Sequence, residues 1–324
     1  MTDMYLLALF LLFTASTTAL AEPLSVGAPL EISGFYGIGD QYQKIRLLGA
    51  LSLSGNDKLA ELSGLAWDED EQLLYAVSDQ GRVLHLQPVF ENGQLSDIQL
   101  IASFRLRDAS DKKFKDKQAD SEGLNIVNGD NGVRADSRLM ISFERDHRLL
   151  LTSTEGKQIK EIPLPAPLDR SSAFRGKNDG IEGFMLHPTL GTLLAAEKPL
   201  KGDDQIRLIS EAGLSWFLPT LEKGGGVVAM DIDPMGGIIV MERAVTSIIR
   251  PWTITLYRVH PSLDNQGESL QPELLARMNS GEDWYFQNLE GLTHVKDRRY
   301  FMVSDDGDSF WQQTQLIYFE IVDQ

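Results

Sequence analysis

The sequence predicts an all-β protein, a β-propeller with five or six four-stranded blades. After residue 22 the chain consists mostly of short apolar runs separated by turn residues. No long stretch has the 3.6-residue apolar period of an amphipathic helix. Pairs of these runs recur with one layout, and the repeats begin about 45 to 60 residues apart, the length of a blade with its loops. A doubly wound α/β fold would need regular helices between the strands.

Each repeat is an apolar strand, a tight polar turn and a second strand that ends at an acidic residue. The turns DEDEQ, HPTLG, DPMGG and KDRR are short and rich in turn formers, as β-hairpins require. The repeats span residues 63–79, 122–145, 182–198, 227–243 and 290–306. The strand region 42–52 and the C-terminal run LIYFEIV are expected to share a further blade and to close the ring.

Residues 1–21 are predicted to be a signal peptide, followed by a single domain over 22–324. An apolar run from Leu6 to Phe13 precedes the small residues that end at Ala21, although Asp3 replaces the usual basic residue. A membrane anchor, the alternative, would need about 20 apolar residues. The chain has no cysteine, so it has neither a disulfide nor a thiolate nucleophile. We therefore expect a periplasmic or secreted protein.

The net charge of -17 indicates the class of partner. It argues against binding to a nucleic-acid backbone, because phosphates repel an acidic surface. It suits a highly soluble protein or one that binds cations. We expect no membrane contact after the signal is removed, and the sequence leaves the oligomeric state open.

An acidic residue followed by glycine opens three of the repeats, at Glu122, Glu182 and Glu290, and Ser63 takes the same place in the first. The innermost strand of each propeller blade lines the central channel, so these side chains are expected to converge at one end of it. Oxygen ligands without cysteine or histidine favour calcium. The predicted metal ligands are Asp79, Glu122, Glu182, Glu242, Glu290 and Asp305.

A basic residue follows the acid at the end of three second strands, in the pairs Glu144-Arg145, Glu197-Lys198 and Glu242-Arg243. Side chains alternate along a strand, so both members of a pair reach the rim only if the strand ends there. Carboxylates, calcium and bases together would suit an anionic ligand such as a phosphate. Ordinary solvated surface pairs are the alternative. The repeat at Val227 lacks the Glu-Gly pair and has only Asp231 nearby.

The set SGLAWD…LYAVSD, SEGL…SFER, NDGIEGF…AAEK, DIDPMGG…MER and NLEGL…MVSDD resembles the phytase-like β-propeller family, which is described by an esterase-like activity of phytase. The resemblance covers residues from about 61 to 308, in matching order. It implies an exported propeller that hydrolyses phosphoesters with calcium. The chain lacks dense Asp-rich calcium loops, so a looser phosphoesterase activity is expected rather than turnover of phytate.

Three functions remain open from the sequence. The first is a calcium-assisted hydrolase of a small phosphorylated substrate, with Glu144 or Glu197 as general base. In it, Arg145, Lys198 and Arg243 would neutralise the phosphoryl oxygens. The second is a non-catalytic periplasmic binding or scaffold propeller with a structural calcium. The third is a lactone or carboxylic-ester hydrolase.

Overall fold

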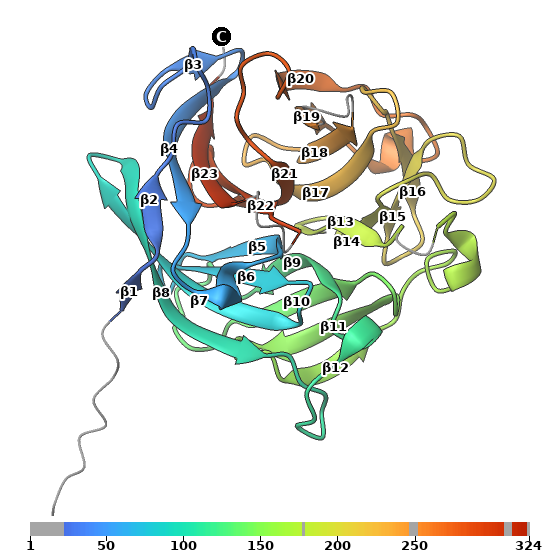
Figure 1. Ribbon diagram of the computed structural model, residues 1–324. Helices are drawn as coiled ribbons and strands as arrows, with labels where there is room; N and C mark the ends of the chain where they lie inside the picture. Colours follow the sequence, from blue (N-terminus) through green and yellow to red (C-terminus); the bar gives the residue numbers. More distant parts are fainter. Residues whose placement is uncertain (1–22, 177–178, 246–251, 308–312, 323–324) are drawn as a thin grey trace, which may run out of the picture.

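The computed structural model describes residues 23–176, 179–245, 252–307 and 313–322. Five antiparallel sheets stand around a common centre, so the protein is a five-bladed β-propeller (Figure 1). The predicted signal peptide lies outside the described residues. Helical structure in the described part consists of four short 3-10 turns, none of them long or apolar enough to cross a membrane. These turns are η1 (Asp57–Leu59), η2 (Asp116–Gln118), η3 (Ser171–Ala173) and η4 (Leu263–Asn265).

Each blade begins with its innermost strand, and the chain then runs outward. The first blade holds β5 (Leu62–Asp68), β6 (Leu73–Ser78), β7 (Arg82–Glu91) and β8 (Gln94–Arg105), with β1 (Leu24–Ser25) added at its edge. The second holds β9 (Ser121–Val127), β10 (Arg138–Phe143), β11 (Arg148–Ser153) and β12 (Gln158–Ile162). The third holds β13 (Ile181–His187), β14 (Gly191–Ala196), β15 (Ile206–Ser210) and β16 (Ser215–Leu218). The fourth holds β17 (Gly226–Ile232), β18 (Ile238–Val245), β19 (Trp252–Val259) and β20 (Glu273–Asn279).

The fifth blade joins the two ends of the chain. It contains β21 (Asn288–His294), β22 (Arg299–Asp305), β23 (Thr314–Ile321), β4 (Ile45–Leu53), β2 (Gly27–Pro29) and β3 (Gln41–Tyr42). The C-terminal β23 pairs with the N-terminal β4 along the whole of β4. The two regions therefore share a blade, as predicted. They complete the fifth blade and not a sixth, because β21 and β22 already supply its inner half.

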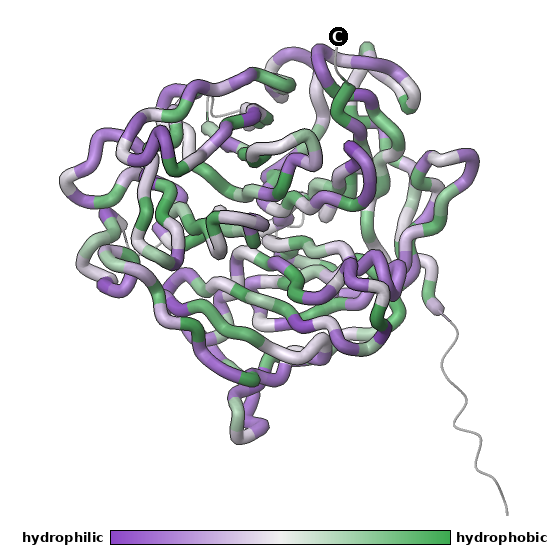
Figure 2. The backbone as a smooth tube through the Cα atoms, turned by 180° about the vertical axis from the view of Figure 1, so that it is seen from behind, coloured by the Kyte–Doolittle hydropathy of each residue, from purple (hydrophilic) through white to green (hydrophobic). Residues whose placement is uncertain are grey.

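The hydrophobic core lies between blades. Five clusters of buried apolar residues each join two neighbouring blades, and the cluster between the fourth and fifth includes Leu47 of β4 and Phe319 of β23. Seen from behind, the strands carry most of the hydrophobic residues while the projecting loops are largely hydrophilic (Figure 2). Because these interfaces hold the five blades in a ring, the ends of the innermost strands face a shared central channel.

A β-bulge recurs at the start of every innermost strand. The pairing with the second strand skips one residue in four blades, at Ser63, Glu182, Val228 and Glu290, and it is shifted in the same way around Glu122. A bulged residue has no partner in the ladder and its side chain is turned out of the regular alternation. The bulges therefore mark equivalent positions at one mouth of the channel.

Candidate functional site

Three carboxylates meet at this mouth. Glu122, Glu182 and Glu290 occupy the bulge positions of the second, third and fifth blades, and Ser63 and Val228 occupy the other two. Burial raises the pKa of Glu122 well above its usual range, and repulsion from nearby carboxylates, Glu182 among them, adds to the rise. The repeat at Val227 contributes no acid to the mouth, since its bulge position is Val228.

In every blade except the fourth, where Ala229 stands instead, a glycine follows the bulge residue and permits close contact between blades. A Cβ on Gly64 would lie 2.6 Å from the backbone oxygen of Glu122, and one on Gly183 would lie 2.7 Å from Cγ1 of Val227. Real Cβ atoms do not approach so closely, so glycine lets the innermost strands pack side by side. The sequence pattern Glu-Gly thus combines an acid aimed at the mouth with a backbone that fits beside the next blade.

A second set of acids stands at the ends of the second strands. Asp79, Glu144 and Glu197 directly follow β6, β10 and β14, and Asp305 is the last residue of β22. The backbone N–H of Glu144 donates to the oxygen of Asp120 at 3.1 Å, and the equivalent N–H groups of Asp79 and Glu197 make the same bond in their blades. One repeated backbone geometry therefore places these carboxylates beside the mouth.

Arg243 lies among the carboxylates. Its guanidinium donates to Glu290 and, at 2.8 Å, to Oδ1 of Asn288, and it lies 3.4 Å from Oε1 of Glu197. Burial alone would lower the pKa of Arg243, but the surrounding carboxylates, Glu290 first, outweigh burial and raise it. Arg243 therefore stays charged and offsets part of the negative charge at the mouth.

Burial raises the pKa of several acids into the neutral range or above it. The pKa of Glu290 rises to about 7 despite the opposing effect of Arg243, and burial and Asp120 raise that of Glu144 to about 7. Burial also raises the pKa of Asp79 to about 9, although the hydroxyl of Ser63 donates to it. The floor below them is apolar, because each bulge residue is followed two positions later by a buried apolar side chain. These are Leu65, Leu124, Phe184, Met230 and Leu292.

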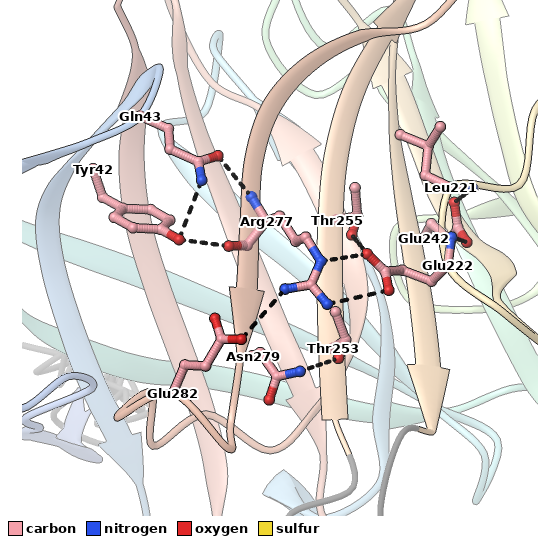
Figure 3. A network of polar contacts seen from close by, with 10 residues as sticks. All are labelled: Tyr42, Gln43, Leu221, Glu222, Glu242, Thr253, Thr255, Arg277, Asn279 and Glu282. Carbon is pink, nitrogen blue, oxygen red and sulfur yellow. Dashed lines mark hydrogen bonds and ion pairs between the residues drawn. The ribbon is translucent and has the colours of Figure 1, made fainter.

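Glu242, predicted as a metal ligand, stands apart from this group. β18 continues to Val245, so neighbouring side chains alternate, and Arg243 faces the mouth while Glu242 faces the loop before β17. Its carboxylate accepts the backbone N–H groups of Leu221 and Glu222, each at 2.8 Å (Figure 3). Glu222 in turn pairs with Arg277 at 2.6 Å. The structure thus gives Glu242 a loop-anchoring position.

The other two predicted bases are each paired with carboxylates. Nε of Arg145 lies 2.8 Å from Asp120 and 3.8 Å from Glu144. Nζ of Lys198 lies 3.2 Å from Glu197 and donates to the backbone oxygen of Gly224 at 3.0 Å. Since β10 and β14 end just before these pairs, acid and base reach the same side there.

One compact group of acids in the described residues has the spacing of a metal site. Single carboxylate oxygens of Asp79, Asp120 and Glu122 all lie within 4.8 Å of one another. Oxygens bound to one calcium at 2.3–2.6 Å span up to about 5 Å, so the spacing fits that ion. Oδ2 of Asp120 is buried and accepts no hydrogen bond, but it forms an ion pair with Nε of Arg145 at 2.8 Å. Asp120 was not among the predicted residues because it precedes the strand opening by two positions.

A basic pocket adjoins this group. A cavity of about 550 Å³ is lined by three bases, Arg105, Lys113 and Lys115, and by two acids, Asp79 and Asp116. The lysines belong to the mixed-charge loop over 107–123, which ends in η2 and runs directly into β9. The sequence analysis did not assign these bases to the site, since nothing local in the sequence shows that the loop folds back beside Asp79.

The comparisons place the chain in a family. Residues 57–308 match the family described as phytase-like, esterase-like activity of phytase. No curated protein matches the sequence. Among solved structures, the Dos1 propeller has 10% identity, a TM-score of 0.35 and coverage of 81% of this chain and 68% of its own. Virginiamycin B lyase from Staphylococcus aureus has 10% identity, a TM-score of 0.41 and coverage of 86% and 100%. Neither likeness bears on the chemistry of the site. The family match covers most of the described propeller, and the chain therefore belongs to the phytase-like family.

Proposed function

We propose that the protein is an exported, calcium-assisted phosphoesterase that acts on a small anionic substrate at the carboxylate mouth. The observation that carries the proposal is the position of Asp79, which belongs to the compact acid group and also lines the basic pocket. The acid group can hold a cation and the adjoining bases can hold an anion. This arrangement suits a phosphate ester whose phosphate contacts both a metal and basic side chains.

Asp79, Asp120 and Glu122 would hold the calcium. The donors are hard carboxylate oxygens, and the buried Oδ2 of Asp120 is compensated by its ion pair with Arg145 but accepts no hydrogen bond. When bound, calcium would supply charge stabilisation to a phosphoryl group. A cation there would also offset the burial that raises the pKa of Glu122 and the carboxylate repulsion that adds to the rise. Glu182 and Glu290 lie in the same mouth, whereas Glu242 is left out of the ligand set because two backbone N–H groups occupy it.

The lysines of the 107–123 loop would bind the substrate. Lys113 and Lys115 are exposed and line the pocket with Arg105, so their charges are available to an incoming phosphate. Arg145, Lys198 and Arg243 are each paired with carboxylates, and we assign them to positioning those acids. Glu144, with its pKa of about 7, is suited to take a proton from the attacking water near neutral pH.

The test compares hydrolysis of 4-nitrophenyl phosphate and 4-nitrophenyl acetate by residues 22–324, with calcium and with chelator. We expect calcium-dependent release from the phosphate ester, abolished in Glu122→Gln. Ala at both Lys113 and Lys115 should raise KM about tenfold, which corresponds to about 1.4 kcal/mol of binding. Lys160→Ala, an exposed lysine on the outer strand β12, is the matched control and should leave KM unchanged.

Other results would select the remaining functions. Turnover of the acetate alone would indicate a carboxylic-ester or lactone hydrolase. A calcium-dependent rise in melting temperature without turnover of either ester would indicate a binding or scaffold propeller. Export has its own test, since the mass of the protein recovered from the bacterial periplasm or medium should match a chain that begins at Glu22.

A further inference from the structure

A second cavity lies at the opposite end of the channel. It measures about 420 Å³ and is lined by residues at the far ends of all five innermost strands, β5, β9, β13, β17 and β21. Between the two mouths the channel narrows to a space of about 10 Å³, which holds at most one water molecule. The second cavity is thus separate from the carboxylate mouth, and its volume lies in the range of small-molecule sites.

A buried carboxylate, Asp231, faces this cavity. Only 9% of the residue is exposed, yet it occupies a position that carries Ala66, Asn125, Met185 and Thr293 in the other four blades. Its two oxygens accept the backbone N–H groups of Ile232 at 2.6 Å and, across the blade boundary, of His294 at 2.7 Å. Each carboxylate oxygen can accept a further hydrogen bond. A buried negative charge is costly unless a positive group compensates it.

Most of the charged and aromatic polar groups around Asp231 are acceptors or have donors that are already used. Glu69 accepts from Nε1 of Trp67 at 2.9 Å and lies 3.1 Å from Nζ of Lys296, which is itself not in the wall. Nε2 of His294 donates to the backbone oxygen of Asp297 at 2.9 Å. Asp130 adds an exposed carboxylate, and among the described residues the wall contains neither lysine nor arginine. A ligand that brings a positive charge would therefore compensate the carboxylates of this wall.

Apolar side chains line the rest of the cavity, among them Ile126, Leu186 and Ile232. We propose that this cavity binds a small organic cation, a primary amine with a short apolar body, whose ammonium group pairs with Asp231. An ammonium group carries three donors and no acceptor, which matches a wall that contains the carboxylates of Asp231, Glu69 and Asp130. The apolar body would contact the aliphatic residues, so a neutral alcohol of the same shape would keep that contact and lose the ion pair.

Calorimetric titration of the full chain tests this site, with cyclohexylamine and 2-phenylethylamine compared with cyclohexanol and 2-phenylethanol. Chelator is present throughout, so the result does not depend on calcium. We expect one amine to bind per chain, with each alcohol at least tenfold weaker. Asp231→Asn keeps an acceptor but removes the charge, and should weaken amine binding at least tenfold while leaving ester hydrolysis unchanged. Glu122→Gln, at the other mouth, should bind amine as the wild type does.

A second variant covers the case in which Asp231→Asn fails to fold. Asn125 is the equivalent residue of the second blade, and its Oδ1 accepts the N–H of Ile126 at 2.9 Å just as Asp231 accepts that of Ile232. Asn125→Asp adds a carboxylate to the same wall and should strengthen amine binding several-fold. The proposal is overturned if no amine binds saturably, if amines and alcohols bind equally, or if neither variant changes the affinity.

Discussion

Raising the pH of the calcium-free protein should destabilise it through Glu290. Burial raises the pKa of this carboxyl from 4.5 to about 7, with Arg243 opposing the rise and Asp305 adding to it. Between those values the unfolded chain has released the proton while the folded protein still holds it. The stabilisation that Glu290 contributes is therefore fully present below pH 4.5 and is lost as the pH rises through about 7.

The shift corresponds to about 3 kcal/mol in total, of which about 2 kcal/mol is lost between pH 5.5 and 8. Urea denaturation in chelator, followed by tryptophan fluorescence at several pH values, measures it. Glu290→Gln keeps the acceptor for Arg243 and Asn288 but cannot ionise, so its free energy of unfolding should fall less steeply with pH. Glu91→Gln, an exposed glutamate in β7, should follow the wild type. If Glu290→Gln and the wild type have parallel profiles, the burial argument is refuted.

Three further substitutions test the packing and the site. Gly64→Ala places a methyl group 2.6 Å from the backbone oxygen of Glu122, and urea denaturation should show a loss of about 1–3 kcal/mol, whereas the exposed Gly37→Ala should change stability little. Phe319→Ala empties the interface at the closing strand and should cost about 3–5 kcal/mol; a loss below about 1 kcal/mol would mean that the closure contributes little to stability. Glu242→Ala removes the acceptor of two loop N–H groups and should cost about 1.5–3 kcal/mol without changing calcium affinity in a titration; weaker calcium binding would return Glu242 to the ligand set.

The repeats predicted the fold because each blade is a local unit. A hairpin needs only alternating apolar residues and a tight turn, and both can be recognised within about 20 residues of sequence. The innermost strands could be assigned from the Glu-Gly pairs, since a glycine beside an acid at a strand opening reflects both the bulge and the close approach of the next blade. Closure by β4 and β23 was also predictable, because two unpaired strands at the ends of the chain need partners.

Side-chain direction was harder to predict. Glu242 and Arg243 look like Glu144 and Arg145 in the sequence, but β18 runs on past its pair whereas β10 stops before it. The extra length of β18 turns Glu242 and Arg243 to opposite sides of the strand. Because β10 ends before its pair, Glu144 and Arg145 can reach the same side. The bulge position of the fourth blade was also uncertain by one residue. It is Val228, whereas the predicted repeat begins at Val227, because the register depends on the partner strand.

The sequence by itself determined the propeller, its acidic mouth and the glycines that let the blades meet, because these features follow from local patterning repeated around a ring. Only the tertiary structure decided that Asp120 stands with Asp79 and Glu122, that Lys113 and Lys115 line a pocket with Asp79, and that Asp231 lies at the far mouth. Those contacts join residues from different blades and from a loop. Their distances depend on how the blades are turned about the axis and not on any local spacing of residues.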